Sequence, residues 1–383
     1  MLSEDRVSKV VILFFGWLAL IVLFAFFVYT LVRPTGTDLS GIHRGFFRSF
    51  FYYDGDWFIG IAKYGYTGIA SALGQPVPYL STAFFPLFPS LIRIFSYPLF
   101  GNYDAAALLV NWASTLGFLI YLFKLVNLES QDHKSDAFRT CLFVLVFPTA
   151  IFLALGYSEA VFLLCATASF YHARRSSWVW AGAWGALACL ARPVGLVVFA
   201  AVGLEALQQS GWKLSRLKPR MAALALIPAG FASYLIFLQV RFGDFLVFTK
   251  AEKEGWGRGF NLAVLFQAPR RLFTSGITSG AFAETLYLIG FVVLFAVLTV
   301  LVFKWYGLPL GILSLGCLAA AIISSPSAHP LLSANRLVLV SFPAFMVLGR
   351  WGRNRNFERV YLVAGTLGLA LFTLLFIKGF WAG

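Results

Sequence analysis

The sequence has few charged residues, few cysteines and few histidines. Only 12% of its 383 residues are charged, 60% are hydrophobic, and the mean hydropathy is +0.81. This balance excludes an ordinary soluble domain and leaves no room for a large catalytic domain outside a membrane. The cysteines lie in apolar runs, without the spacing of metal ligands or of a disulfide framework. They are Cys141, Cys165, Cys189 and Cys317.

Acidic residues are the scarcer charged class, with 16 Asp and Glu against 30 Lys and Arg and a net charge of +14. In a soluble protein this excess would suggest binding to nucleic acid. Multi-pass membrane proteins, however, carry surplus Lys and Arg in their cytoplasmic loops, so we expect no nucleic-acid partner. The sequence also lacks an N-x-S/T acceptor for glycosylation, which favours a prokaryotic plasma membrane over the endoplasmic reticulum.

Long apolar runs fill most of the chain. The first, 11–32, is too long for the core of a signal peptide, and no small-residue cleavage site follows it, so we expect an uncleaved first helix. With the N-terminus inside, the pattern predicts an all-α polytopic membrane protein, one integral-membrane domain over 1–383 with about eleven spans. These lie near 11–32, 103–124, 138–155, 158–172, 178–191, 194–209, 221–240, 284–303, 306–323, 335–349 and 360–378.

The connections between these helices predict the orientation. Short basic connections, among them "KLVNLESQDHKSDAFR", "HARRSS", "GWKLSRLKPR" and "RWGRNRNFER", would face the cytoplasm. The long segments 33–102 and 241–283 would lie outside, with 324–336. The first of them carries prolines and Arg93 in an apolar stretch, which favours re-entrant or interfacial helices. Several predicted helices are short and nearly adjacent, which implies a cavity open to the outer side.

Two acids stand in the aromatic stretch "FFYYDGDWFIGIAKYGYTG" at 50–68. If the chain is helical there, Asp54 shares a face with Trp57 and Phe58, whereas Asp56 points about 200° away. Only one of the two acids is therefore expected to enter a common site. Capping of the helix by Asp54 is an equal alternative on this pattern alone.

Other charged residues stand at the ends of predicted helices. Glu159 is a functional candidate, because an acid at membrane depth is costly, although capping beside Ser158 is the competing interpretation. Arg192 and Arg336 would suit a phosphate held by charge-assisted hydrogen bonds, or they anchor their helices at the interface. His329 lies in a predicted loop, where a lone histidine is usually polar surface.

The loop "RFGDFLVFTKAEKEGWGRGF" mixes acids, bases and a tryptophan: Asp244, Lys250, Lys253, Trp256 and Arg258. This mixture suits a polar or anionic group beneath an aromatic lid. It equally suits an interfacial segment with tryptophan at the headgroups and basic residues near lipid phosphate.

Together these stretches resemble a known family, the PIG-V-like glycosyltransferases of the GT-C class, related to the second mannosyltransferase of GPI-anchor assembly. The family pattern W-D-x-x-W/H-Y/F-x-x-I-A-x-x-G-Y is matched by "YDGDWFIGIAKYGY", with Tyr53 in place of tryptophan. Similar stretches follow in order: "AFFPLFPSLIR", "GYSEAVFLL" with "LARPVGL", and "FGDFLVFTKA" with "WGR". The late "ANRLVLVSFPAFMVLG" is a looser match. The resemblance covers most of the chain.

The resemblance implies transfer of a sugar, mannose in the eukaryotic relatives, from a polyprenyl-phosphate carrier to a hydroxyl of a glycolipid, glycan or protein acceptor. By motif position Asp54 is the catalytic acid residue, and Asp56 occupies a variable slot. A carboxylate near the attacking hydroxyl can take its proton as the new bond forms. The departing phosphate, with a second pKa of about 6, needs no general acid. Direct displacement would invert the anomeric centre.

The candidate site therefore has three groups of residues. Asp54 is the candidate general base. Arg192, Arg258 and Arg336 are candidates for binding the donor phosphate. The candidates for other substrate contacts are Asp56, Trp57, Glu159, Asp244, Trp256 and His329. We expect no cofactor and no divalent metal, since "DGD" is not read as a nucleotide-sugar metal motif. A transporter or flippase of a lipid-linked glycan, and an inert membrane partner, remain as alternatives.

Overall fold

The computed structural model describes residues 4–31, 45–72, 78–129 and 135–383, and over these residues the chain is helical without strands. Parts of the predicted outer segment 33–102 and of the connection at 124–139 lie outside the described residues. The helices are α1 Glu4–Leu31, α2 Asp54–Ala72, α3 Leu87–Ser96, α4 Tyr103–Glu129, α5 Ser135–Leu145, α6 Glu159–Arg174, α7 Trp178–Ala191, α8 Gly195–Gln209, α9 Leu226–Phe242, α10 Val247–Trp256, α11 Val264–Thr274, α12 Gly280–Ile323, α13 Ala334–Leu337, α14 Phe342–Trp351 and α15 Arg355–Ile377.

Within the described residues, five helices are long and apolar enough to cross a membrane. They are Val7–Leu31, Tyr103–Glu129, Pro219–Phe242, Gly280–Tyr306 and Arg355–Ile377. Four further apolar helices are shorter: Leu87–Ser96, Trp178–Ala191, Gly195–Gln209 and Leu308–Ile323. The chain is thus a multi-pass helical membrane protein, whereas the count of eleven spans is not confirmed.

Prolines and one glycine explain where predicted spans break. The predicted span 138–155 is wrong as one helix, because α5 ends at Leu145 shortly before Pro148 and a short 3₁₀ turn follows. The predicted span 335–349 likewise divides into α13, a 3₁₀ turn and α14, which carries Pro343 in its first turn. The predicted spans 284–303 and 306–323 both lie in α12, which kinks between them at Gly307, where φ is 84°.

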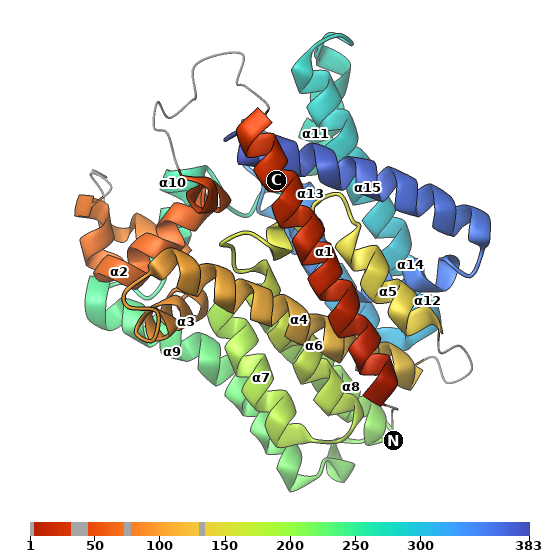
Figure 1. The fold of residues 1–383 in the computed structure, drawn as a ribbon. Helices are drawn as coiled ribbons and strands as arrows, with labels where there is room; N and C mark the ends of the chain where they lie inside the picture. The colour runs from red at the N-terminus through yellow and green to blue at the C-terminus, as the bar shows by residue number, and fades with distance from the viewer. Residues whose placement is uncertain (1–3, 32–44, 73–77, 130–134) are drawn as a thin grey trace.

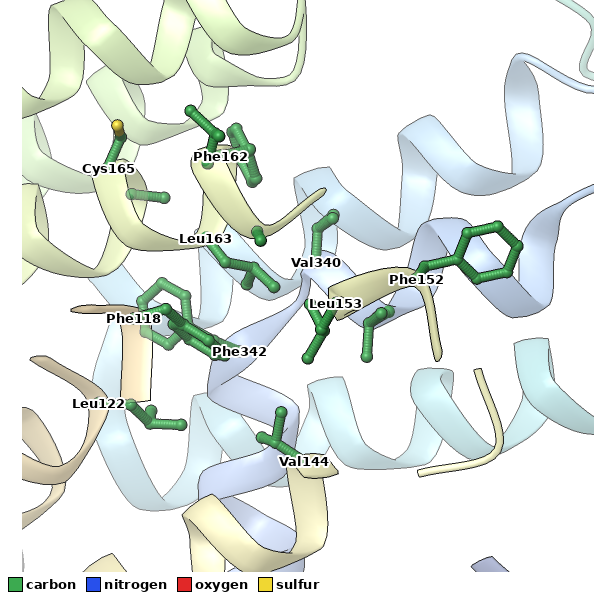
Figure 2. Close-up of a cluster of buried hydrophobic side chains, with 14 of the residues drawn as sticks. Phe118, Leu122, Val144, Phe152, Leu153, Phe162, Leu163, Cys165, Val340 and Phe342 are labelled. Carbon is green, nitrogen blue, oxygen red and sulfur yellow. The ribbon is translucent and has the colours of Figure 1, made fainter. Parts of the chain in front are cut away.

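The core lies where α4, α5, α6 and α14 pack together (Figure 2). Phe118 of α4, Phe162 of α6 and Phe342 of α14 are fully buried there. Because lipid does not drive helices together as water does, close packing of small residues holds such bundles. Gly182 of α7 shows this: a Cβ at that position would lie 2.1 Å from the carbonyl oxygen of Ala223.

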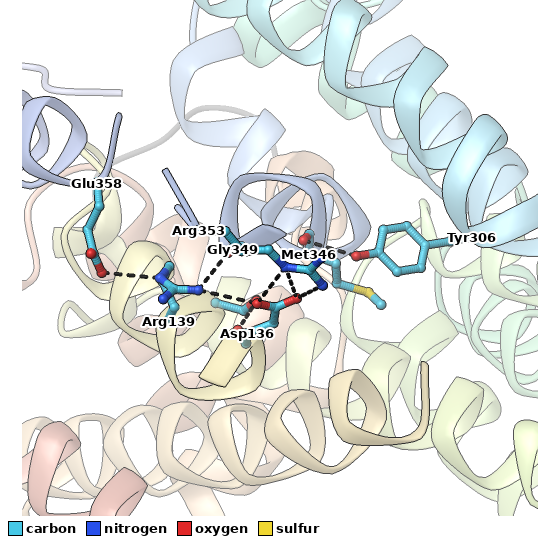
Figure 3. Close-up of polar contacts among 8 residues, drawn as sticks. Asp136, Arg139, Tyr306, Met346, Gly349, Arg353 and Glu358 are labelled. Atoms are coloured by element: carbon cyan, nitrogen blue, oxygen red, sulfur yellow. Dashed lines mark hydrogen bonds and ion pairs between the residues drawn. The ribbon is translucent and has the colours of Figure 1, made fainter. Parts of the chain in front are cut away.

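A charged cluster, here called the Asp136 cluster, joins the start of α5 to the connection between α14 and α15 (Figure 3). The buried Asp136 carboxylate accepts from Arg353 Nη2 at 2.5 Å and from Arg139 Nη1 at 3.2 Å. Arg139 Nε also contacts Glu358 Oε1 at 3.1 Å, and its Nη1 donates to the carbonyl of Gly349. Every carboxylate of this cluster therefore has a cationic partner.

Candidate active site

A cavity of about 1030 Å³ lies between α10, α13, the starts of α2, α6 and α8, and the C-terminal ends of α7 and α12. Its lining contains six charged residues from distant parts of the chain: Asp54, Glu159, Arg192, Glu252, Arg258 and Arg336. A large, partly apolar cavity with converging polar groups is the usual form of a ligand site.

Asp54 lies at the cavity wall as the first residue of α2. Its Oδ2 accepts from Arg336 Nη1 at 2.8 Å, and its side chain is 18% exposed. The preceding Tyr53 has a left-handed φ of 59°, a conformation that costs a non-glycine residue about 1–3 kcal/mol. Its hydroxyl donates to the carbonyl of Gly379 at 2.6 Å, which holds this turn in place. The Asp54 side chain is thus used for an ion pair in the cavity.

Arg336 connects Asp54 to a second carboxylate. Its Nε lies 3.1 Å from Glu159 Oε1, and the same oxygen lies 2.6 Å from Arg192 Nη1. The guanidinium of Arg336 also lies 5.2–5.4 Å from the ring centres of Phe152, Tyr157 and Trp381. A buried guanidinium needs such partners, because desolvation of an unpaired charge is costly.

Local sequence explains how these charges reach the cavity. Arg192 precedes Pro193, which favours the extended conformation observed (φ −158°, ψ 150°) and ends α7. Glu159 begins α6, where the helix dipole favours an acid. The short helix α13 with Arg336 follows Ser333, whose φ is 69°. Asn335 Nδ2 donates to the carbonyl of Ala382 and further fixes this segment.

Arg258 follows the end of α10, which Gly257 closes with a left-handed φ of 64°. Its Nη2 donates to Ser333 Oγ at 2.9 Å. Burial lowers the pKa of the Arg258 guanidinium, and nearby Glu252 opposes that shift. Since no ion pair of Arg258 occurs within the described residues, this poorly solvated cation is suited to an incoming anion.

An aromatic wall connects α10 to α2. Trp57 stacks on Phe84 with ring centres 5.5 Å apart, and Trp256 meets both rings edge-on at 5.7 Å and 5.2 Å. Trp256 and Phe84 line the cavity, whereas Trp57 packs behind them. Both tryptophans are predicted to contact substrate. Trp256 lines the cavity, whereas Trp57 supports its wall from behind.

Besides Trp57, three predicted substrate residues lie outside the cavity lining. Asp56 accepts from Arg48 Nη2 at 2.6 Å, and Arg48 also binds Asp104. Asp244 accepts the backbone N–H of Leu246 at 2.8 Å in a local turn, and His329 Nδ1 lies 3.5 Å from Arg271 Nη1. The structure thus separates Asp56 from Asp54, as their helical spacing indicates.

Glu252 is the cavity residue that sequence reasoning missed. Burial raises the pKa of its carboxyl group, and the nearby Asp54 charge raises it further, while arginines lower it. In the sequence, Glu252 stands two residues from Glu254, which puts the two acids on opposite faces of a helix, but the spacing does not tell which face lines a cavity. The fold does, because Glu254 accepts from the hydroxyl of Tyr79 on the outer surface of α10.

The fold and this cavity define a multi-pass membrane protein with a charged candidate active site. A family model described as mannosyltransferase (PIG-V) matches residues 28–250, more than half of the chain. The chain belongs to this family, so the predicted resemblance is confirmed and the protein is a glycosyltransferase. The match includes Asp54, Glu159 and Arg192, whereas Arg258 and Arg336 lie beyond it.

A solved structure is similar to this chain in fold. ArnT from Cupriavidus metallidurans, bound to undecaprenyl phosphate, has 16% identity and a TM-score of 0.51, over 95% of this chain and 74% of ArnT. The apo oligosaccharyltransferase of Archaeoglobus fulgidus has 12% identity and a TM-score of 0.40, over 97% of this chain and 56% of that one. No curated protein matches the chain. The predicted GT-C fold class is confirmed.

Proposed function

We propose that the protein transfers a sugar, mannose in the first instance, from a polyprenyl-phosphate donor to an acceptor hydroxyl of a glycolipid, glycan or protein. The observation that carries this proposal is the chain of ion pairs from Asp54 through Arg336 and Glu159 to Arg192, along one wall of the cavity. It joins a candidate base to two candidate phosphate ligands. Family membership and the undecaprenyl phosphate bound to ArnT support the donor class.

In the proposed reaction, the acceptor oxygen attacks the anomeric carbon from the side opposite the phosphate. The bond between that carbon and the phosphate oxygen breaks, and its electron pair leaves with the polyprenyl phosphate. The hydroxyl proton passes to Asp54, which Arg336 orients. Because one displacement occurs, the anomeric centre inverts.

The leaving phosphate gains negative charge as the bond breaks. Fixed cations in a site with little water stabilise such charge without reorganising. Arg336 and Arg192 share the carboxylate of Glu159, and Arg336 also pairs with Asp54. Arg258 donates to the neutral Ser333 hydroxyl, so its guanidinium is the cation best placed to meet a phosphate. Glu159 is only 1% exposed, so we assign it to positioning the two arginines rather than to touching the sugar.

We place this reaction on the outer side of the membrane. Glu159 lies at the start of α6, and the basic connection after Arg174 lies at its other end, about 24 Å away for 16 residues. α8 likewise starts near Arg192 and ends before the basic connection at 211–220. Basic connections favour the cytoplasm, which supports an outward cavity. A prokaryotic plasma membrane stays a prediction from the absent glycosylation acceptor.

Purified protein tests the proposal with radiolabelled mannosyl-phosphate polyprenol and extracted cell lipids. We expect a labelled glycolipid product from the wild type and about 10²–10⁴-fold less from Asp54→Asn. Asp56→Asn is the matched control, since Asp56 faces Arg48 outside the cavity, and should retain transfer. Transfer by Asp54→Asn at the wild-type rate would remove Asp54 as the base. Translocation of a lipid-linked glycan without any new glycosidic bond would favour the flippase.

A further inference from the structure

Glu252 differs from the other carboxylates of the cavity in its partners. Asp54 and Glu159 are both held by arginines. Within the described residues, Glu252 has no side-chain hydrogen bond or ion pair, although it is half-buried in the cavity wall. A half-buried carboxylate without a hydrogen-bond or ion-pair partner costs folding free energy, so stability does not explain a glutamate at this position.

The position of Glu252 relative to the other charges is also informative. Its carboxylate lies within electrostatic range of Asp54 and of all three cavity arginines. The backbone N–H of Arg258 donates to the carbonyl of Glu252 at 3.0 Å, so both residues belong to the same end of α10. Glu252 therefore lines the same cavity as Asp54 and the three arginines.

α10 presents an aromatic ring beside this carboxylate. Glu252 and Trp256 are four residues apart, which puts them on one face of the helix, and both line the cavity. The Trp256 ring is fixed edge-on against Trp57 and Phe84. One face of α10 thus combines a free hydrogen-bond acceptor with a fixed apolar ring.

This combination suits a pyranose. A carboxylate has two oxygens that accept from neighbouring hydroxyls, and an aromatic ring covers the C–H face of a sugar. Sites that hydrogen-bond a substrate hydroxyl also reject analogues that lack it much more strongly than apolar pockets do. We propose that Glu252, with Trp256 beside it, binds hydroxyls of the transferred sugar and so determines which donor sugar the protein accepts. This inference rests on the proposed function, because it takes a lipid-phosphate-linked sugar as the ligand.

Equilibrium binding to the full-length protein in nanodiscs separates sugar contacts from phosphate contacts. The two probes are mannosyl-phosphate polyprenol and the same polyprenyl phosphate without sugar. Glu252→Gln and Glu252→Ala should weaken binding of the first probe about tenfold or more, the loss of a hydrogen bond to a charged group. They should leave binding of the second unchanged or tighter, because a negative charge near the phosphate is removed.

Glu254→Gln is the matched control on the same helix and should bind both probes as the wild type does, since the glutamine oxygen can still accept from Tyr79. A second series uses donors that each lack one sugar hydroxyl. Once the donor lacks the hydroxyl that Glu252 binds, removing the Glu252 carboxylate as well should cause no further loss of binding affinity.

Two results would overturn the inference while the proposed function stands. Equal weakening of both probes in the Glu252 variants would make Glu252 a support of the cavity, and wild-type binding of both probes in the variants would exclude a sugar contact. If the wild type binds neither probe, the proposed donor class itself fails, and the inference fails with it.

Discussion

The cavity network and the Asp136 cluster are both built from arginines and carboxylates, but they differ in what they leave unpaired. In the Asp136 cluster, Asp136 has two arginine partners, and Arg139 reaches on to Glu358. In the cavity, Glu252 has no ion-pair partner within the described residues, and Arg258 donates its side-chain hydrogen bond to a serine. Charges that satisfy one another stabilise or orient helices, whereas charges left with free capacity beside a cavity indicate binding and catalysis.

The largest effect on stability is expected in the Asp136 cluster. Asp136→Ala leaves Arg139 without one partner and Arg353 without its carboxylate, and breaking a buried pair typically costs about 3–5 kcal/mol. We expect a much lower thermal unfolding midpoint in detergent. Protein that remains folded at low temperature should keep wild-type activity per molecule. A normal midpoint, or full stability with lost activity, would contradict the assignment of this cluster to structure.

Arg336→Lys tests the cavity network with a smaller expected effect. Lysine keeps the charge but lacks the planar fork that contacts Asp54 and Glu159 together. We expect kcat/KM for sugar transfer to fall about 10- to 100-fold, from the loss of the hydrogen bond to Asp54 and the ion pair with Glu159. Arg48→Lys makes the same change in a bridge between Asp56 and Asp104. An equal loss of activity in both variants would remove the distinction between the two bridges.

Glu252→Gln should stabilise the protein in a pH-dependent way. The pKa of Glu252 is raised in the folded protein, so the folded state binds this proton more tightly than the unfolded state does. Ionising Glu252 therefore costs stability as the pH rises above the usual range of glutamate. The variant and the wild type should have similar unfolding midpoints near pH 4, and the variant a higher one near pH 8. A difference that shrinks as the pH rises would show that Glu252 is stabilised by its surroundings.

The smallest effect is expected from removing divalent metal ions. Three arginines line the cavity and can stabilise the charge that develops on the phosphate. In the part of the chain that the structure describes, no group of three or more His, Cys, Asp or Glu side chains is arranged to hold a metal. We predict that transfer proceeds at an unchanged rate with excess EDTA. Loss of activity with EDTA and its return with Mg²⁺ or Mn²⁺ would contradict this prediction.

Much of the architecture could be predicted from the sequence, because apolar length and helix-breaking residues act locally. The spans at 103–124 and 178–191 correspond to α4 and α7. The helical spacing also separates Asp54 from Asp56 correctly. The error at 138–155 came from following hydrophobicity through Pro148, which lacks the N–H that a continuing helix needs.

The site was less accessible to sequence reasoning, because its contacts join distant segments. Arg336 and Asp54 are separated by 282 positions, and no local pattern announces that they meet. The role of Glu252 depends on which face of α10 lines the cavity, and this depends on the packing of Trp256 against α2. A helical wheel of 247–256 places Glu252 and Trp256 together, and this was the one signal in the sequence that could have found it.

The most direct test of the central claim is a single-turnover measurement of mannose transfer by purified wild-type protein and Asp54→Asn over a range of pH. We expect the variant to bind the sugar-bearing lipid but to form product about 10²–10⁴-fold more slowly at every pH. Product formation by Asp54→Asn at the wild-type rate would contradict the account.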